Sequence, residues 1–365
     1  MTHPDLASLG WSDHFARQLD ADEPPDATVA PARLMGVERD HVLALDPARG
    51  PEPLRLAVPR EPSAGISPVE GGTGGLAVGD WVLQDGHRVT RRLAPLSEIA
   101  RRVAGDTSRR QLVVANVDAL GVVTSCNADF NPGRIERYLA VAAQAGCLPL
   151  VVLTKADLAG DAGALRREAQ RLSPLATVLA LDAREAEEAR RLDPWCGPGR
   201  TLALVGSSGV GKTTLQNHLT GAEARTAAIR EGDAKGRHTT TARTLRRALA
   251  GGCLIDTPGM RELGLVDAAE GVAEVFADVE ALAASCRFRD CTHGGEPGCA
   301  VRAAVEAGTL DEDRVRRHEK LAREERFNSE ALHERHARAR AFGRMHRQVK
   351  PKGGRRREVP GARDD

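Results

Sequence analysis

The sequence predicts an α/β domain with a mostly parallel sheet, flanked by an N-terminal antiparallel β-barrel and a small C-terminal helical domain. Three observations predict this class. Short alternating segments between Gly, Pro and Asp turns fill residues 33–92, apolar runs alternate with helical patterns over residues 105–272, and a Cys/His cluster precedes a charged, Ala-rich stretch. A length of 365 residues allows two or three such domains.

Composition excludes several classes of protein. Hydrophobic residues make up 41% and charged residues 28%, which argues against a fibrous or wholly disordered chain. No apolar run reaches the ~18 residues of a membrane span, and the N-terminus lacks the apolar core of a secretory signal, so we expect a cytoplasmic protein with no membrane partner. The net charge is only +1, but residues 314–358 carry 16 Lys or Arg against 6 Asp or Glu.

The first hundred residues are expected to hold an arm and a barrel. Residues 1–32 are polar and Pro-rich and predict a flexible arm. Residues 33–100 predict a small antiparallel barrel or sandwich, in which Trp81 is a core residue and Asp85-Gly86 marks a hairpin. Its first four strands are expected at Leu34–Val37, His41–Leu45, Leu54–Val58 and Trp81–Leu83.

The α/β domain is expected over residues 105–272, because strands that alternate with helices form a parallel sheet covered on both faces. A helical metal-binding domain over residues 273–342 and a basic disordered tail over 343–365 follow. Strands of the α/β domain are expected at residues 112–117, 119–124, 148–153, 177–181, 201–205, 245–249 and 252–256, and helices at 132–145, 164–172, 184–192 and 212–219.

A glycine-rich loop of the form G-x-x-x-x-G-K-[ST] lies between an expected strand and an expected helix, as a phosphate-binding loop requires. Its backbone amides would surround phosphate oxygens, Lys212 would neutralise their charge, and the Thr213 hydroxyl would bind Mg²⁺. The predicted phosphate-binding residues are Gly206, Ser207, Ser208, Gly209, Val210, Gly211, Lys212, Thr213 and Thr214.

Two further segments are predicted to complete the phosphate and Mg²⁺ site. Asp256 ends a strand and is suited to hold Mg²⁺ through water, while Gly259 can donate an amide to a γ-phosphate. The Thr-rich stretch 236–241 could order around the γ-phosphate, with Thr240 on Mg²⁺, or it could equally be an edge strand.

The predicted base-recognition motif lies upstream of the phosphate loop. Thr154-Lys155-Ala156-Asp157 resembles the N-K-x-D motif of GTPases, in which the Asp accepts hydrogen bonds from guanine. Asp182-Ala183 follows the next strand, where GTPases keep a Ser-Ala contact to the base. Ordinary GTPases have the phosphate loop first, so this order predicts a circularly permuted domain.

This order of motifs, together with residues 129–138, 236–241 and 256–263 and the Cys cluster, closely resembles the RsgA (YjeQ) family of circularly permuted GTPases. The resemblance covers about residues 33–316 and implies an N-terminal OB-fold, a central GTPase domain, a zinc-binding C-terminal domain and a role in late maturation of the 30S subunit. It also implies that Thr154–Asp157 contact guanine. Thr154 in place of Asn and Asp182 in place of Ser depart from GTPases generally.

Four potential metal ligands, Cys286, Cys291, His293 and Cys299, lie within fourteen positions. Three thiolates and an imidazole suit one structural Zn²⁺ and leave no open coordination position. Coincidental reduced cysteines are the alternative.

Met260 stands where many GTPases place a water-orienting Gln, so intrinsic hydrolysis is expected to be slow. His238 is the candidate catalytic residue, because an imidazole can position water near neutral pH. The alternative is an exposed loop histidine with no role.

The motifs together with the resemblance to the RsgA family imply a monomeric GTPase that binds GTP and GDP with Mg²⁺, binds the 30S subunit and 16S rRNA, and couples hydrolysis to release. The subunit is expected to stimulate hydrolysis, and the basic C-terminal region to contact rRNA phosphates. The alternative is a ribosome-binding or RNA-binding module in which the nucleotide is structural only. A P-loop kinase is disfavoured, because no lid-like Arg cluster accompanies a second substrate motif.

Overall fold

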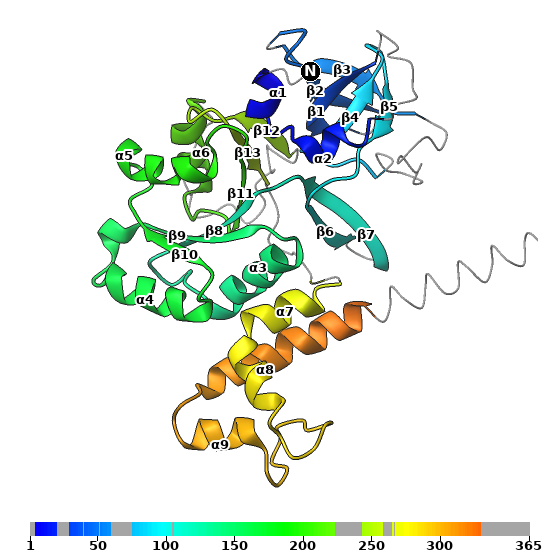
Figure 1. The fold of residues 1–365 in the computed structure, drawn as a ribbon. Helices are drawn as coiled ribbons and strands as arrows, with labels where there is room; N and C mark the ends of the chain where they lie inside the picture. The colour runs from blue at the N-terminus through cyan, green and yellow to red at the C-terminus, as the bar shows by residue number, and fades with distance from the viewer. Residues whose placement is uncertain are drawn as a thin grey trace, which may run out of the picture.

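The computed structural model describes residues 4–19, 29–38, 40–50, 52–59, 75–103, 106–222, 243–257, 265 and 267–329. Three parts follow one another along the chain: a β-barrel, an α/β domain and a helical C-terminal part, which lie at the top, middle and bottom of Figure 1. The α/β domain therefore contacts both of the smaller parts.

The N-terminal part is a five-stranded antiparallel barrel, which resolves the barrel-or-sandwich alternative. Its sheet has the order β3-β2-β1-β4-β5, and a parallel bridge between Ala57 and Arg88 joins the two edge strands. This closed five-stranded barrel has the OB-fold architecture. The strands are β1 (Ala30–Val37), β2 (His41–Leu45), β3 (Leu54–Ala57), β4 (Trp81–Gln84) and β5 (Val89–Arg92).

The start of the chain differs from the expected flexible arm over residues 1–32. Two short helices, α1 (Pro4–Ser8) and α2 (Asp13–Ala16), bring Phe15 to full burial against Trp81, with 5.9 Å between the ring centroids. Trp81 is itself fully buried, as predicted for a core residue. The described part of the arm is packed because it covers aromatic surface that the barrel leaves open.

Residues 112–117 were expected as a strand of the parallel sheet, and this expectation is wrong. Residues 112–115 form the end of β7 (Asp106–Ala115), which pairs with β6 (Glu98–Val103) in a separate two-stranded antiparallel sheet. The chain then turns at Asn116, whose φ is +55°, before it enters the main sheet.

The α/β domain is built on a six-stranded sheet with the order β10-β9-β8-β11-β13-β12. All its pairs are parallel except β12 with β13, which form a hairpin whose connection is too short for a parallel crossover. The strands are β8 (Ala119–Ser125), β9 (Leu148–Thr154), β10 (Thr177–Ala180), β11 (Thr201–Gly206), β12 (Thr244–Arg247) and β13 (Cys253–Asp256).

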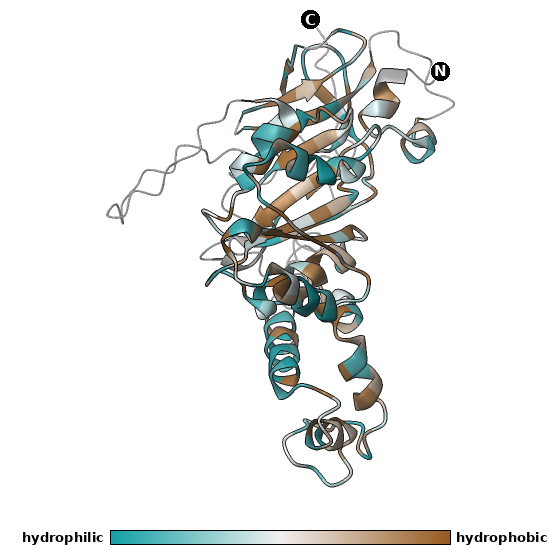
Figure 2. Ribbon diagram, turned by 90° about the vertical axis from the view of Figure 1, so that its left-hand side faces the viewer, coloured by the Kyte–Doolittle hydropathy of each residue, from teal (hydrophilic) through white to brown (hydrophobic). Residues whose placement is uncertain are grey.

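Both faces of this sheet are buried, and Figure 2 shows its hydrophobic strands in the middle of the molecule. Alternate residues of β11 enter different cores: Ala203 and Val205 face one side, and Leu202 and Leu204 face the other. The covering helices are α3 (Pro132–Gln144), η1 (Ala156–Leu158), α4 (Ala162–Leu172), α5 (Ala186–Ala189) with η2 (Arg190–Trp195), and α6 (Lys212–Thr220).

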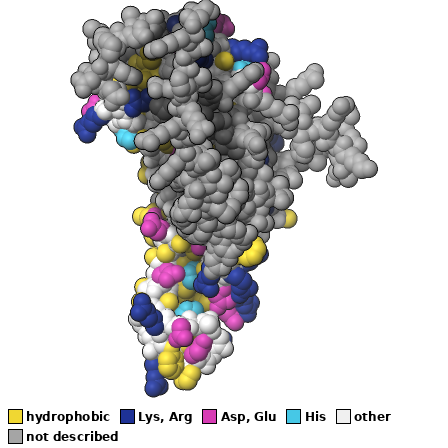
Figure 3. Space-filling model, turned by 90° about the vertical axis from the view of Figure 1, so that its right-hand side faces the viewer, with side chains coloured by type: hydrophobic (Ala, Val, Ile, Leu, Met, Phe, Trp, Pro, Cys, Tyr) yellow, Lys and Arg dark blue, Asp and Glu magenta, His cyan; other side chains and the backbone are white. Residues whose placement is uncertain are grey.

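The C-terminal part packs on α3 of the α/β domain. Helix α7 crosses α3 closely at Gly271, where an added Cβ would lie 2.1 Å from the Ala140 carbonyl oxygen. Positive, negative and apolar side chains mix on its exposed surface (Figure 3). Its helices are α7 (Ala269–Val275), α8 (Ala277–Ala283), α9 (Ala300–Glu306) and a further helix over residues 312–329.

Within the described residues, no helix is both long enough and apolar enough to span a bilayer. The expected basic tail over residues 343–365 lies outside the described residues.

Candidate nucleotide site at the carboxyl edge of the sheet

The glycine-rich loop connects the carboxyl end of β11 to the start of α6. Gly206 has a φ of +140°, and an added Cβ would lie 2.0 Å from the Val123 carbonyl oxygen of the neighbouring strand β8. Gly209 and Gly211 also have positive φ values, of 77° and 94°. The loop therefore needs glycine for its backbone path.

Lys212 holds this loop together. Its Nζ donates a hydrogen bond of 2.9 Å to the Gly206 carbonyl oxygen and another to the Ser207 carbonyl oxygen. The ammonium group thus lies inside the loop at the N-terminus of α6, where free backbone amides and a positive charge suit a phosphate.

Oxygen ligands for a divalent cation lie on the neighbouring elements. Asp256 is the last residue of β13 and pairs with Leu204 of β11, two residues before the loop begins. Thr213 is exposed in the first turn of α6. Thr257, which is buried, donates to the Leu204 carbonyl oxygen and fixes the end of β13 against β11. A hydroxyl and a carboxylate at one edge of the sheet are donors that fit Mg²⁺.

The predicted base-recognition motif lies directly beside the phosphate loop. Thr154, at the end of β9, is fully buried, and its Oγ1 donates to the Val210 carbonyl oxygen at 2.6 Å. Gly211 lies against the same residue, since a Cβ there would be 3.6 Å from Thr154 Cγ2 and 3.4 Å from Ala183 Cβ. Loops that are far apart in sequence thus meet at one point.

Asp157, whose carboxylate is expected to bind guanine, lies three residues after Thr154 in the sequence. Lys155 has a left-handed backbone conformation, with a φ of +56°, and turns the chain into η1, which contains Asp157. The side chain of Asp157 is 28% exposed and is therefore open to a ligand. Thr154, in the position of the usual Asn, connects this turn to the phosphate loop through its hydroxyl.

Arg184 is a residue of this site that the sequence interpretation did not identify. Its Nη2 lies 2.7 Å from Oδ2 of Asp157 and 2.7 Å from Oδ2 of Asp182. Hydrogen bonds from the Arg184 side chain and backbone lower the pKa of the Asp182 carboxyl. The sequence did contain a chemical indication of Arg184: an acidic residue at the Ser position of a base-recognition loop needs a nearby cation.

Three predicted site residues, His238, Thr240 and Gly259, lie outside the residues that the structure describes, as does the whole Thr-rich stretch 236–241. The structure therefore assigns them no position.

The cysteine and histidine side chains predicted as metal ligands converge between α8 and α9. The ligand atoms of Cys286, Cys291, His293 and Cys299 all lie within 4.8 Å of one another. The Sγ atoms of Cys286 and Cys299 are 3.9 Å apart, and Nδ1 of His293 is 3.7 Å and 3.4 Å from them. A tetrahedral Zn²⁺ with Zn–S bonds of about 2.3 Å places sulfur ligands about 3.8 Å apart. The donor set and spacing fit a metal ion.

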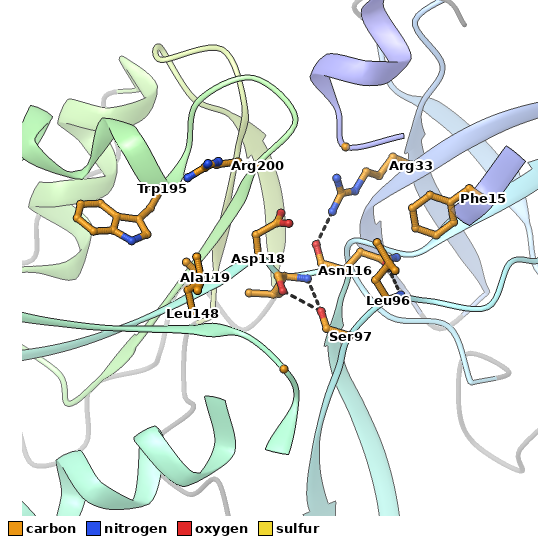
Figure 4. A pocket seen from close by; sticks show the side chains of 13 residues that line it. Phe15, Arg33, Leu96, Ser97, Asn116, Asp118, Ala119, Leu148, Trp195 and Arg200 are labelled. Atoms are coloured by element: carbon orange, nitrogen blue, oxygen red, sulfur yellow. Dashed lines mark hydrogen bonds between the residues drawn. The ribbon is translucent and has the colours of Figure 1, made fainter. Parts of the chain in front are cut away.

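A cavity of about 350 Å³ lies at the opposite, amino edge of the sheet (Figure 4). Asp118, directly before β8, and Leu148, the first residue of β9, line it together with Arg33 of the barrel. Burial raises the pKa of Asp118, whose carboxylate accepts a hydrogen bond from the Thr201 amide. This cavity belongs to the junction between the barrel and the α/β domain and is separate from the phosphate loop.

Comparison with known proteins agrees with this geometry. The RsgA GTPase family model matches residues 95–266. A Mesorhizobium japonicum protein described as small ribosomal subunit biogenesis GTPase RsgA is 49% identical over 332 residues, which are 89% of this chain and 91% of that protein. Small ribosomal subunit biogenesis GTPase RsgA 2 of Vibrio parahaemolyticus is 44% identical over 347 residues, 94% of this chain and 92% of the relative.

Solved structures share the fold. YjeQ from Thermotoga maritima matches with a TM-score of 0.57 at 24% identity, over 81% of this chain and 98% of its own. YloQ, described as a circularly permuted GTPase, matches with a TM-score of 0.56 at 21% identity, over 83% of this chain and 97% of its own. The predicted rotated order of the strands is confirmed.

Proposed function

The chain belongs to the RsgA family of GTPases. From this premise we propose that the protein binds the small ribosomal subunit late in the subunit's maturation and couples GTP hydrolysis to its own release from the subunit. The observation that carries the proposal is the contact between the two nucleotide motifs. Thr154 donates to the Val210 carbonyl oxygen at 2.6 Å, so the turn with Asp157 and the loop with Lys212 can hold the two ends of one nucleotide.

Each part of the site has a distinct role. Asp157 accepts hydrogen bonds from the guanine base, the stem of Lys155 covers the ring, and the segment Asp182-Ala183 lies beside the base. The amides of residues 206–214 and the Lys212 ammonium hold the phosphates. Thr213, Asp256 and Thr240 would hold Mg²⁺, which neutralises charge on the β- and γ-phosphates when bound.

His238 is proposed to position the attacking water. No Gln follows Gly259, because the next residue is Met260, and a thioether cannot orient water. Intrinsic hydrolysis would accordingly be slow, and the small subunit would accelerate it.

The Cys/His cluster is proposed to bind one structural Zn²⁺. Its segment carries little hydrophobic core of its own, so the metal would hold the chain between α8 and α9 in place.

The partner is proposed from the relatives and from charge. Both curated relatives described above are small ribosomal subunit biogenesis GTPases by name. The excess of Lys and Arg between residues 314 and 358 suits contact with 16S rRNA phosphates, and the OB-fold barrel suits an RNA surface. The protein would act as a cytoplasmic monomer.

Single-turnover GTP hydrolysis with and without purified 30S subunits tests this function. We expect 30S subunits to raise the rate, and Lys212→Ala to abolish hydrolysis in both conditions, while Arg171→Ala, which changes an exposed arginine in the last turn of α4, retains it. A rate unaffected by both 30S subunits and Lys212→Ala would reject the proposal.

Co-sedimentation with 30S subunits tests the coupling to release. Binding should be tighter with a non-hydrolysable GTP analogue than with GDP. Equal binding with either nucleotide would favour the alternative of a ribosome-binding module with a structural nucleotide.

A further inference from the structure

The base-recognition loop has an unusual acidic residue, Asp182, beside the carboxylate of Asp157. GTPases generally have Ser at this position, and a hydroxyl can donate a hydrogen bond to a neighbouring carboxylate. An ionised Asp can only accept, and two carboxylates at close range repel each other. With Asp182 alone, Asp157 would lack a partner that holds its orientation.

Arg184 supplies the missing donor. Its backbone amide donates to Asp182 Oδ1 at 2.9 Å, its Nε lies 3.0 Å and 3.2 Å from the two oxygens of Asp182, and its Nη2 reaches Oδ2 at 2.7 Å. These bonds fix the guanidinium on its own loop. The same Nη2 then reaches Oδ2 of Asp157 at 2.7 Å. Asp182 therefore anchors the arginine, and the arginine holds Asp157.

This arrangement leaves room for a base on Asp157. A carboxylate offers about four acceptor positions, and the Arg184 contact uses one of them on Oδ2. Guanine presents two adjacent donors, N1–H and the exocyclic amine, and the remaining positions of Asp157 can accept both. The arginine and the base can thus bind the same carboxylate together.

We propose that Arg184 is a positioning residue for guanine recognition, which replaces the usual Ser contact by a bridge from Asp182 to Asp157. This inference rests on the proposed guanine site. Arg184 acts through Asp157, by holding its carboxylate in the orientation that the two guanine donors require. The side chain of Arg184 is 68% exposed, so its substitution should leave the core of the domain undisturbed.

The test measures the dissociation constants of GDP and IDP for the full-length protein. Inosine lacks the exocyclic amine, so the ratio of the two constants reports how well Asp157 reads guanine. The pair of Arg184 and Asp157 is exposed, so its contribution is modest. We expect Arg184→Ala to weaken GDP binding about threefold to fivefold and to weaken IDP binding less.

A second substitution makes the test specific. Asp182→Ser in the Arg184→Ala background removes the competing carboxylate and supplies a hydroxyl donor, so it should restore most of the preference for GDP. Arg190→Ala is the matched control, because Arg190 forms an exposed ion pair with Glu187 at 2.7 Å and does not contact Asp157. It should bind GDP and IDP as the unmodified protein does.

The outcomes separate this inference from the proposed function. If Asp157→Ala leaves GDP binding unchanged, the guanine site itself is wrong. If Asp157→Ala abolishes binding while Arg184→Ala keeps the unmodified GDP and IDP constants, only the role of Arg184 is overturned. A double variant that fails to regain the GDP preference would overturn it as well.

Discussion

At the scale of single residues, the proposed nucleotide site depends on positions where the neighbouring backbone leaves no room for a Cβ atom. The position of the phosphate loop against β8 is set by Gly206, where a Cβ would meet the Val123 carbonyl oxygen at 2.0 Å. Thr154 and Gly211 then bring the base-recognition turn into contact with the same loop. Small residues and one buried hydroxyl therefore determine how the phosphate loop and the base-recognition turn lie against each other.

Gly206→Ala tests this constraint. The added methyl group must displace backbone, and the φ of +140° is strained for any residue with a Cβ, so we expect destabilisation of about 1–3 kcal/mol or more together with loss of GDP binding. Urea unfolding and GDP titration measure the two effects.

Gly146→Ala is the control for backbone strain alone. Gly146 has a φ of +68°, and a Cβ there would meet nothing within 4 Å. An equal loss of stability in both variants would contradict the role assigned to the contact with Val123.

The residues that the sequence predicted best are those defined by local spacing. The phosphate loop and the four potential metal ligands are each brought together in the structure, because a fixed number of residues between glycines or ligands restricts the chain. Arg184 was missed because its contact with Asp157 depends on the separation of two strands, β9 and β10. That separation is a property of the sheet and not of either segment alone.

At the scale of elements, α3 connects the α/β domain to the C-terminal part through a buried carboxylate. Glu136, which is fully buried, accepts hydrogen bonds from Arg314 Nη1 at 3.0 Å and Arg317 Nε at 2.7 Å, both in the helix over residues 312–329. Arg314 also pairs with Asp278 of α8 at 2.6 Å. These ion pairs hold three helices together.

Glu136→Gln should weaken this junction strongly. The change takes the close carboxylate partner from Arg317 and leaves Arg314 with Asp278, so we expect a cost near the lower end of about 3–5 kcal/mol for a broken buried pair. We expect faster amide hydrogen exchange in α8 and the helix over residues 312–329. Glu188→Gln, which breaks an exposed pair with Arg191, is the matched control and should cost less than about 1 kcal/mol. Comparable exchange in the two variants would show that the junction does not depend on Glu136.

The element that holds the Cys/His cluster should depend on bound metal. Chelation of the metal is expected to raise hydrogen exchange in α8 and α9 while the six-stranded sheet stays protected, because metal binding substitutes for a missing core. Cys291→Ser should lower the zinc content measured by atomic absorption from about one per chain, whereas Cys126→Ser should retain it. A chain that contains no zinc when purified intact, or retains it without Cys291, would contradict the assignment.

Element assignments from the sequence failed where pairing partners lie outside the segment. The run 112–117 is apolar and β-branched, which predicts a strand, but nothing in it specifies β6 as its neighbour. The segment before the barrel was expected to be flexible because nothing within it shows what it packs on. Phe15 packs against Trp81, which lies 66 positions later in the sequence. Local patterns predict the type of element better than its partners.

At the scale of the whole molecule, the rotated order of motifs connects nucleotide binding to the rest of the chain. Asp256 ends β13, which is the last strand of the sheet in sequence order, and α7 of the C-terminal part is the next element along the chain. The chain after Asp256 therefore leads to the helices that pack on α3. This arrangement suits a protein whose grip on a large partner depends on its nucleotide.

The central claim is that Asp157, in the base-recognition turn, and Lys212, in the phosphate loop that follows it in the sequence, bind one guanine nucleotide. The most direct measurement compares the affinities of GDP and XDP for the unmodified protein and for Asp157→Asn. Xanthine has a carbonyl oxygen where guanine has its exocyclic amine, and an Asn amide can donate to that oxygen. The account predicts that the unmodified protein prefers GDP and that Asp157→Asn prefers XDP. An unchanged preference for GDP in Asp157→Asn would contradict it.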